Sequence, residues 1–282
     1  MRWSRLPILL RSVVLGLLVT AVPTLLWGVL LQVNLKLSAQ TPWAAILMAV
    51  FLICYWKYLQ GWGWPHSLAS QRRNGLRAPA LAPAVWAWSL LAGGFGLAAS
   101  IALFLVAHRL VHWPVAAAPD FSKFPAPTIF VTLLMSAIVA GFSEESGFRG
   151  YMQSPLEGRY GPATAILITS VIFGLLHLSH GFFAPAILFD IGWGAFYGLL
   201  AWRSGSIVPA LVLHSAADFL EFMLIWKLPH RAPAPLLWQA PPDVRFWAEC
   251  ALIVVMSAMS AFAIRRLRRP SDFRSQSLAV AR

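Results

Sequence analysis

Hydrophobic residues make up 59% of the 282-residue chain, and only 11% of its residues are charged. Soluble domains carry about a quarter charged residues, so this chain has too few to cover a surface that faces water. The net charge of +12 does not indicate a nucleic-acid partner, because its densest cluster, RRLRRP at 265–270, directly follows an apolar segment. Basic residues in that position are topology signals. The composition therefore predicts an all-α, polytopic membrane protein surrounded by a lipid bilayer.

Eight apolar segments are long enough for transmembrane helices, since a bilayer core of about 30 Å requires about 20 apolar residues. In chain order they are residues 12–31, 42–59, 84–107, 127–145, 162–179, 184–202, 207–226 and 246–264. Both cysteines, Cys54 and Cys250, fall inside these segments. Their positions indicate neither a disulfide nor a cysteine metal site.

The lysines and arginines predict the orientation of these spans. If the N-terminus is cytoplasmic, sixteen of the basic residues fall on the cytoplasmic side and six on the other. This asymmetry favours a multi-pass protein of the plasma membrane, a bacterial inner membrane, with both termini in the cytoplasm. The loops at 180–184 and 227–245 would then lie outside. We expect the tail after Pro270 to be a disordered cytoplasmic end.

The positions of the polar residues divide the chain into three regions. Residues 1–126 contain spans without a motif, and residues 227–282 contain the last span and the basic tail. Residues 127–226 contain the ionisable groups at membrane depth, which are costly there and are functional candidates by default. These candidates are Glu144, Glu145, Arg149, His177, His214 and Asp218.

The spacing of the candidates indicates that they converge. Glu145 and Arg149 are four residues apart and share a helix face, as do His214 and Asp218. A turn near Arg159–Gly161 would place Glu144 and His177 at one level on antiparallel helices, each roughly 24 Å from the turn at 1.5 Å per residue. His214 lies about 13 Å beyond the next turn by the same rise. We therefore expect one intramembrane cavity that opens toward the cytoplasm.

Two chemistries fit these residues, and both lead to hydrolysis. A glutamate could act as general base on a water molecule, with Arg149 keeping a neighbouring carboxylate ionised and a histidine stabilising an oxyanion. Alternatively, Glu144, His177 and His214 could bind a catalytic zinc ion. A different class of function also fits, because intramembrane Glu, His and Asp residues line proton-coupled transporters.

Three short segments resemble a known family. The segments EESGFR (144–149), FGLLH (173–177) and HSAAD (214–218) are similar to the three ordered motifs of the CPBP intramembrane proteases, over about residues 127–222. This family comprises the CAAX proteases and bacteriocin-processing enzymes and is also called the abortive-infection family. The resemblance implies a membrane-embedded helical endopeptidase with a cytoplasm-facing cavity. Its substrates would be membrane-associated proteins or peptides, and a non-catalytic peptide-binding member is the alternative.

The resemblance also implies roles for individual residues. Glu144 would activate the water together with His177, and Glu145 and Arg149 would support the site. His214 and the residue at position 218 would form the oxyanion side.

Position 218 departs from one version of the pattern, because Asp218 stands where an asparagine is often found. An ionised carboxylate cannot donate a hydrogen bond to an oxyanion. Asp218 would therefore be protonated, or would orient His214.

The resemblance does not decide whether the site uses a metal. We expect no obligatory cofactor, because Arg149 would lie close to a zinc dication and oppose its binding. Zinc held by Glu144, His177 and His214 is the alternative.

Overall fold

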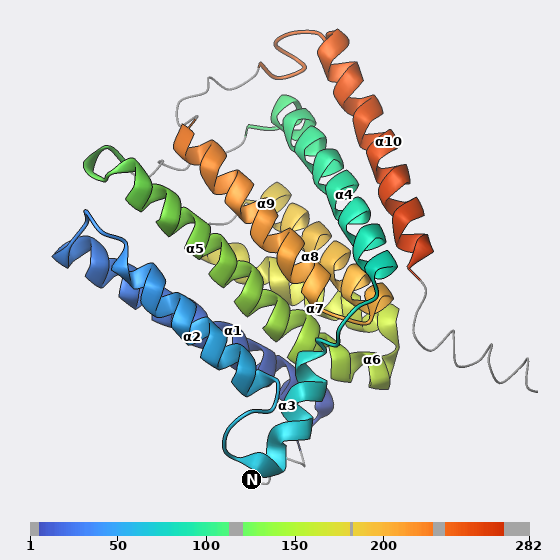
Figure 1. Ribbon diagram of the computed structural model, residues 1–282. Helices are drawn as coiled ribbons and strands as arrows, with labels where there is room; N and C mark the ends of the chain where they lie inside the picture. The colour runs from blue at the N-terminus through green and yellow to red at the C-terminus, as the bar shows by residue number, and fades with distance from the viewer. Residues whose placement is uncertain (1–5, 113–120, 181–182, 228–234, 268–282) are drawn as a thin grey trace, which may run out of the picture. The chain divides into compact units, whose positions relative to one another are not determined.

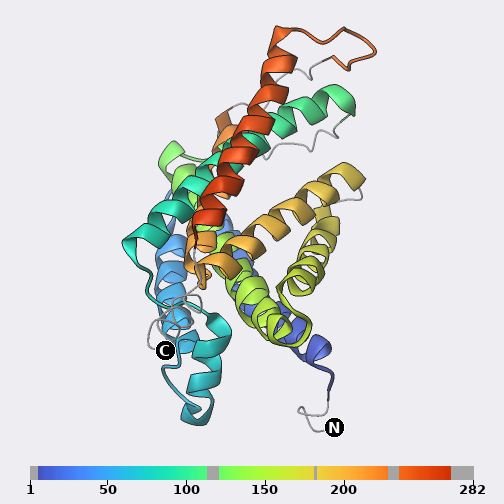
Figure 2. The same ribbon diagram turned by 90° about the vertical axis from the view of Figure 1, so that its right-hand side faces the viewer.

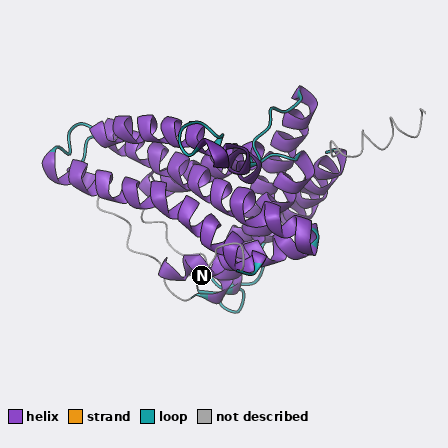
Figure 3. Cartoon of the chain, turned by 90° about the horizontal axis from the view of Figure 1, so that it is seen from below, coloured by secondary structure: helices purple, strands orange, loops and turns teal. Residues whose placement is uncertain are grey.

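The computed structural model describes residues 6–112, 121–180, 183–227 and 235–267. These residues form helices joined by loops, with no strand among them (Figures 1 and 3). The all-α prediction is therefore confirmed. The longer helices are α1 (Ile8–Leu37), α2 (Trp43–Leu59), α4 (Pro83–Leu110), α5 (Ala126–Glu144), α7 (Pro162–Leu176), α8 (Ala184–Ser204), α9 (Val208–Lys227) and α10 (Val244–Arg266). The shorter helices are η2 (His66–Leu68), α3 (Ala69–Leu76), η3 (Phe121–Lys123), η4 (Glu145–Gln153), α6 (Ser154–Tyr160) and η5 (His177–His180).

The apolar helices coincide with the predicted spans. Within the described residues, six helical stretches are long and apolar enough to cross a membrane: α1, α4, the continuous stretch Ala126–Tyr160, α8, α9 and α10. Two shorter apolar helices, α2 and α7, occupy the remaining predicted segments. The chain is thus a multi-pass membrane protein of about eight spans.

The helices form two compact units. The first takes in the described residues of Met1–Ala80 and Asp120–Met223, and the second those of Leu81–Pro119 and Leu224–Arg282. All six candidate site residues belong to the first unit. The three regions predicted from the motifs, 1–126, 127–226 and 227–282, are a division by sequence features and stay a prediction.

In the second unit, α4 and α10 run side by side (Figures 1 and 2). The Ser260 hydroxyl of α10 donates a hydrogen bond to the Ala92 carbonyl of α4 at 2.8 Å. The predicted tail after Pro270 lies outside the described residues, as do parts of the predicted outer loops at 180–184 and 227–245.

In the first unit, the helix that begins at Ala126 changes its hydrogen-bonding pattern where the polar motif starts. α5 ends at Glu144, and Glu145–Gln153 form the π-helix η4, in which every residue is buried. A π-helix is wider than an α-helix and often marks a functional site. From the sequence, Glu145 and Arg149 were expected to share one face of an ordinary α-helix. The π-helix in this segment differs from that expectation.

The packing of α1 against η4 explains why small residues occur in this segment. A Cβ added at Gly147 would lie 2.5 Å from the Gly16 carbonyl oxygen and would overlap Thr20 Oγ1. The two backbones can therefore approach closely only with glycine at this crossing. Thr20 also donates to the Ser143 carbonyl at 3.3 Å, so α1 contacts the chain immediately before Glu144.

Helix α3 supports η4 from another direction. Arg72 donates to the carbonyls of Tyr58, Trp62, Gly63 and Pro65 at 2.8–3.1 Å, which fixes the loop between α2 and α3. The Tyr151 hydroxyl of η4 donates to the Arg72 carbonyl at 2.9 Å. The π-helix is therefore tied to a short helix as well as to the spans.

Large apolar side chains cover the outward surface of the first two helices. They include Leu25 and Val29 on α1, and Ile46, Val50 and Ile53 on α2. Such a surface is unfavourable in water but suits contact with lipid tails. The polar residues of the motif lie instead in the protein interior.

Candidate active site

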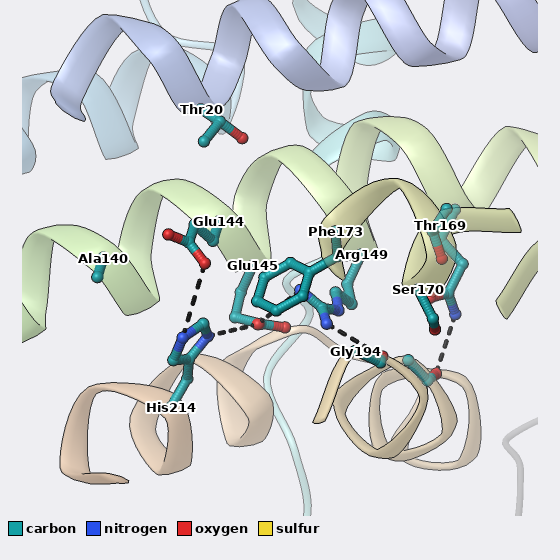
Figure 4. Close-up of polar contacts among 12 residues, drawn as sticks. Thr20, Ala140, Glu144, Glu145, Arg149, Thr169, Ser170, Phe173, Gly194 and His214 are labelled. Atoms are coloured by element: carbon teal, nitrogen blue, oxygen red, sulfur yellow. Dashed lines mark hydrogen bonds and ion pairs between the residues drawn. The ribbon is translucent and has the colours of Figure 1, made fainter. Parts of the chain in front are cut away.

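Five of the six predicted site residues meet where the α5–η4 junction packs against α9. Figure 4 shows four of them, all but Asp218. Glu144 is the last residue of α5, and Glu145 and Arg149 lie in η4. His214 and Asp218 come from α9. The sixth residue, His177, begins η5 directly after α7.

A buried ion pair forms the centre of the cluster. Arg149 Nη1 lies 3.0 Å from Glu145 Oε1, and the two side chains are 1% and 0% exposed. The contact is an ion pair rather than a well-aligned hydrogen bond. Arg149 Nη2 donates to the Gly194 carbonyl of α8 at 3.0 Å, and its guanidinium lies 4.6 Å from the Phe173 ring centroid. Removing either charge would leave the other buried and uncompensated.

His214 is oriented by the same carboxylate. Its Nδ1 lies 2.8 Å from Glu145 Oε1, and Figure 4 shows Glu145 between His214 and Arg149. An ionised carboxylate can only accept hydrogen bonds, so Nδ1 carries the proton and donates it. Because the hydrogen bond of one ring nitrogen fixes the role of the other, Nε2 is the nitrogen left for chemistry.

His214 Nε2 faces two further carboxylates. Glu144 Oε2 lies 3.7 Å from it and Asp218 Oδ2 lies 3.6 Å from it. The side chains of Glu144 and Asp218 are 22% and 23% exposed, whereas that of Glu145 is fully buried. Glu144 and Asp218 therefore form the accessible edge of the cluster.

The charges of the cluster restrict its protonation. With Glu144, Glu145 and Asp218 ionised, three negative charges face Arg149 and His214. A neutral His214 would direct its Nε2 lone pair at two carboxylates, which is unfavourable. A proton on Nε2, or on one of the two facing carboxyl groups, relieves that repulsion.

His177 and His214 both contact the ring of Phe173. The Phe173 ring lies 4.7 Å from the His177 ring and 6.1 Å from the His214 ring, between centroids. His177 Nδ1 lies 2.9 Å from the Phe173 carbonyl oxygen, which can only accept a hydrogen bond. In its neutral form, His177 therefore has Nε2 as the basic nitrogen.

Two of the three predicted zinc ligands, Glu144 and His214, lie 3.7 Å apart between Oε2 and Nε2. In the described part of the chain, no group of three or more His, Cys, Asp or Glu side chains is arranged to hold a metal ion. His214 Nδ1 is engaged by Glu145, which leaves Nε2 open, and the Phe173 ring contacts both His177 and His214. Zinc bound by Glu144, His177 and His214 stays the alternative to a site without a metal.

Tyr197 of α8 is a site residue that was not predicted from the sequence. This residue is buried, and its ring stacks on the His214 ring with 4.7 Å between centroids and 13° between planes. A lone tyrosine in an apolar span carries no polar pattern that would single it out. In the sequence, close helix packing near Tyr197 is indicated by the glycines at positions 194 and 198 on either side of it.

The fold and this cluster define a multi-pass helical membrane protein with a charged site inside its helical core. Residues 126–220 match the family model described as Rce1-like, type II CAAX prenyl endopeptidase. This match confirms the resemblance seen in the three motifs, and it supports a role as an intramembrane protease. No curated protein and no solved structure matches the chain.

The buried ion pair predicts a large stability difference between two arginine variants. Arg149→Leu should lower the free energy of unfolding by about 3–5 kcal/mol, because the buried Glu145 loses its partner. Arg245→Leu should cost less than about 1 kcal/mol, since the Arg245 side chain, paired with Glu249 at 2.9 Å, is 63% exposed. Thermal unfolding in detergent micelles measures both.

A double variant separates charge from packing in the same measurement. Glu145→Gln combined with Arg149→Leu should be more stable than Arg149→Leu alone, because no buried charge is left unpaired. Equal unfolding temperatures for Arg149→Leu and Arg245→Leu would contradict the assignment of a stabilising buried pair.

Proposed function

We propose that the protein is an intramembrane endopeptidase that hydrolyses peptide bonds of membrane-associated protein or peptide substrates. The contrast between two adjacent carboxylates carries this proposal. Glu145 is fully buried and paired with Arg149, whereas Glu144 is partly exposed and faces His214 Nε2 at 3.7 Å. Carboxyl groups in unlike surroundings take different roles in a hydrolytic site. Glu145 is suited to hold Arg149 and His214 in place, and Glu144 is suited to act as the general base.

The proposed reaction begins at Glu144. Its carboxylate accepts a proton from a water molecule, and the oxygen of that water attacks the carbonyl carbon of the scissile peptide bond. The protonated Glu144 then gives its proton to the leaving nitrogen as the C–N bond breaks. His177 assists through Nε2, the basic nitrogen left by its Nδ1 contact with the Phe173 carbonyl.

His214 and Asp218 form the oxyanion side in this proposal. When His214 is protonated, Nδ1 donates to Glu145 and Nε2 can donate to the oxygen that becomes negative during attack. Donors held in place before the reaction stabilise such charge effectively. Asp218, with Oδ2 3.6 Å from Nε2, orients the imidazolium as a carboxylate partner or, when protonated, donates a hydrogen bond itself.

We propose that this reaction needs no obligatory metal. The support is electrostatic, because Arg149 lies 3.0 Å from Glu145, which in turn bonds to His214. A dication bound at His214 would experience this guanidinium at short range.

The substrate class and the location complete the proposal. A site between transmembrane helices favours protein or peptide segments that are held in or at the bilayer. Prenyl substrates are named in the description of the matching family, and membrane-associated peptides in general are the class proposed for this chain. The positive-inside distribution supports a plasma membrane location with both termini in the cytoplasm.

Glu144→Gln should abolish cleavage while leaving expression unchanged, because the substitution keeps the size of the side chain and removes the base. We expect turnover to fall by at least about 100-fold, the lower range for loss of general base catalysis. Peptidomics of membranes from cells that carry either form should reveal substrates that accumulate uncut in the variant. Glu249→Gln, a matched change outside the site, should leave the peptide pattern unchanged.

Other outcomes of that comparison would favour the rival functions. Normal cleavage by Glu144→Gln would exclude the proposed base. Identical peptide patterns with and without the wild-type chain, together with retained peptide binding, would indicate a non-catalytic peptide-binding protein. A graded loss of proton-coupled uptake would indicate a transporter.

Chelation tests the proposed independence from metal. The purified protein should retain its activity after exhaustive treatment with a membrane-compatible chelator, and elemental analysis should find well below one zinc per chain. Stoichiometric zinc, with activity lost on its removal and restored on its return, would decide for the metalloprotease alternative.

A further inference from the structure

Helix α8 carries none of the three motifs, yet it supplies the flat surface against which His214 lies. The Tyr197 and His214 rings are nearly parallel, at 13°, with centroids 4.7 Å apart. Tyr197 is 2% exposed. On α8, Trp193 also stacks against Tyr197 at 5.0 Å and 24°. His214 is therefore in contact with an ordered aromatic stack.

Two hydrogen bonds from the π-helix hold α8 in place. Arg149 donates to the Gly194 carbonyl at 3.0 Å, and Gln153 donates to the Gly198 carbonyl at 2.9 Å. Donors and acceptors are each four residues apart, so the two bonds fix both the height and the rotation of α8. Tyr197 lies between the two acceptor positions.

Small residues are needed for this docking. A Cβ at Gly194 would lie 3.0 Å from Ser170 Cα, and a Cβ at Gly198 would lie 2.7 Å from Gln153 Oε1. A side chain at position 194 would press on the backbone of α7, and one at position 198 would displace the end of the Gln153 side chain that donates to α8. The glycines therefore allow the approach that brings Tyr197 to His214.

The contacts of His214 show what the stack adds. The hydrogen bond from Nδ1 to Glu145 fixes one atom of the imidazole, but the ring, which is attached through Cγ, can still tilt about the line through Cγ and Nδ1. The Tyr197 face fixes the plane of the ring, and Phe173 limits it from another direction with 6.1 Å between centroids. With the plane fixed, Nε2 points to the edge formed by Glu144 and Asp218.

We propose that Tyr197 is a positioning residue for His214, and that its ring rather than its hydroxyl performs this role. Stacking of aromatic rings is favourable, and an aromatic face also attracts a cation when the imidazole is protonated. Tyr197 thus directs Nε2 toward the reacting carbonyl without touching the substrate. This inference rests on the proposed peptidase function.

Two substitutions at position 197 test the role of the ring. Tyr197→Phe keeps the stack and should retain activity within about threefold of wild type. Tyr197→Leu removes the stack and should lower kcat by at least about tenfold with little change in KM, since misplacing a reacting group by about 1 Å can cost on the order of 100-fold. Tyr160→Leu, the same change at a tyrosine of α6 that is 42% exposed, should stay close to wild type.

A second readout does not depend on turnover. Diethyl pyrocarbonate acylates accessible, unprotonated imidazoles, and peptide mass spectrometry reports the extent at each histidine. Labelling of His214 should be slow in wild type, Tyr197→Phe and Tyr160→Leu, because the side chain is 7% exposed. It should rise several-fold in Tyr197→Leu, with the exposed His66 as internal reference.

The outcomes distinguish this inference from the proposed function. Equal activity and equal His214 labelling in the Leu and Phe variants would overturn the positioning role, and so would an equal loss of activity in both, which would point to the hydroxyl. If the wild-type chain cleaves no peptide while labelling follows the expected pattern, the peptidase proposal fails and the orientation of His214 by Tyr197 stands.

Discussion

The geometry of the site depends on one buried ion pair. Glu145 and Arg149 are almost completely removed from solvent, and at membrane depth neither charge is tolerable alone. Their pairing places Glu145 Oε1 where it also accepts from His214. It also directs the second guanidinium nitrogen at the Gly194 carbonyl of α8. One interaction thus links the π-helix to both helices that complete the site.

The π-helical segment makes this arrangement possible. Its residues are buried on all sides, and the close crossing at Gly16 and Gly147 lets α1 pack directly against it. Helix α1, which carries none of the three motifs, therefore packs against the segment that contains Glu145 and Arg149. Glu144 stands at the last α-helical position before the change, so it remains at the accessible edge while Glu145 turns inward.

The apolar segments and the convergence of the motifs could be predicted from the sequence, because bilayer thickness sets helix length and charges at membrane depth are rare. Counting residues from the turns also predicted the turn at Gly161 and the approach of Glu144 to His214, and both are present. The π-helix could not be predicted, since residue spacing does not distinguish i+4 from i+5 hydrogen bonding. The position of Tyr197 on His214, and the contact of Phe173 with both histidines, depend on tertiary packing that apolar spans do not encode.

The most direct test of the account is a double-mutant cycle between Glu145 and His214, read as kcat/KM for one peptide substrate. In the proposed mechanism, Glu145 acts on the reaction through the orientation of His214. Glu145→Gln and His214→Gln should therefore be strongly non-additive, as expected for residues that act as a unit, and the double variant should be no slower than the slower single variant. Multiplicative losses, the behaviour of independent sites, would contradict the claim.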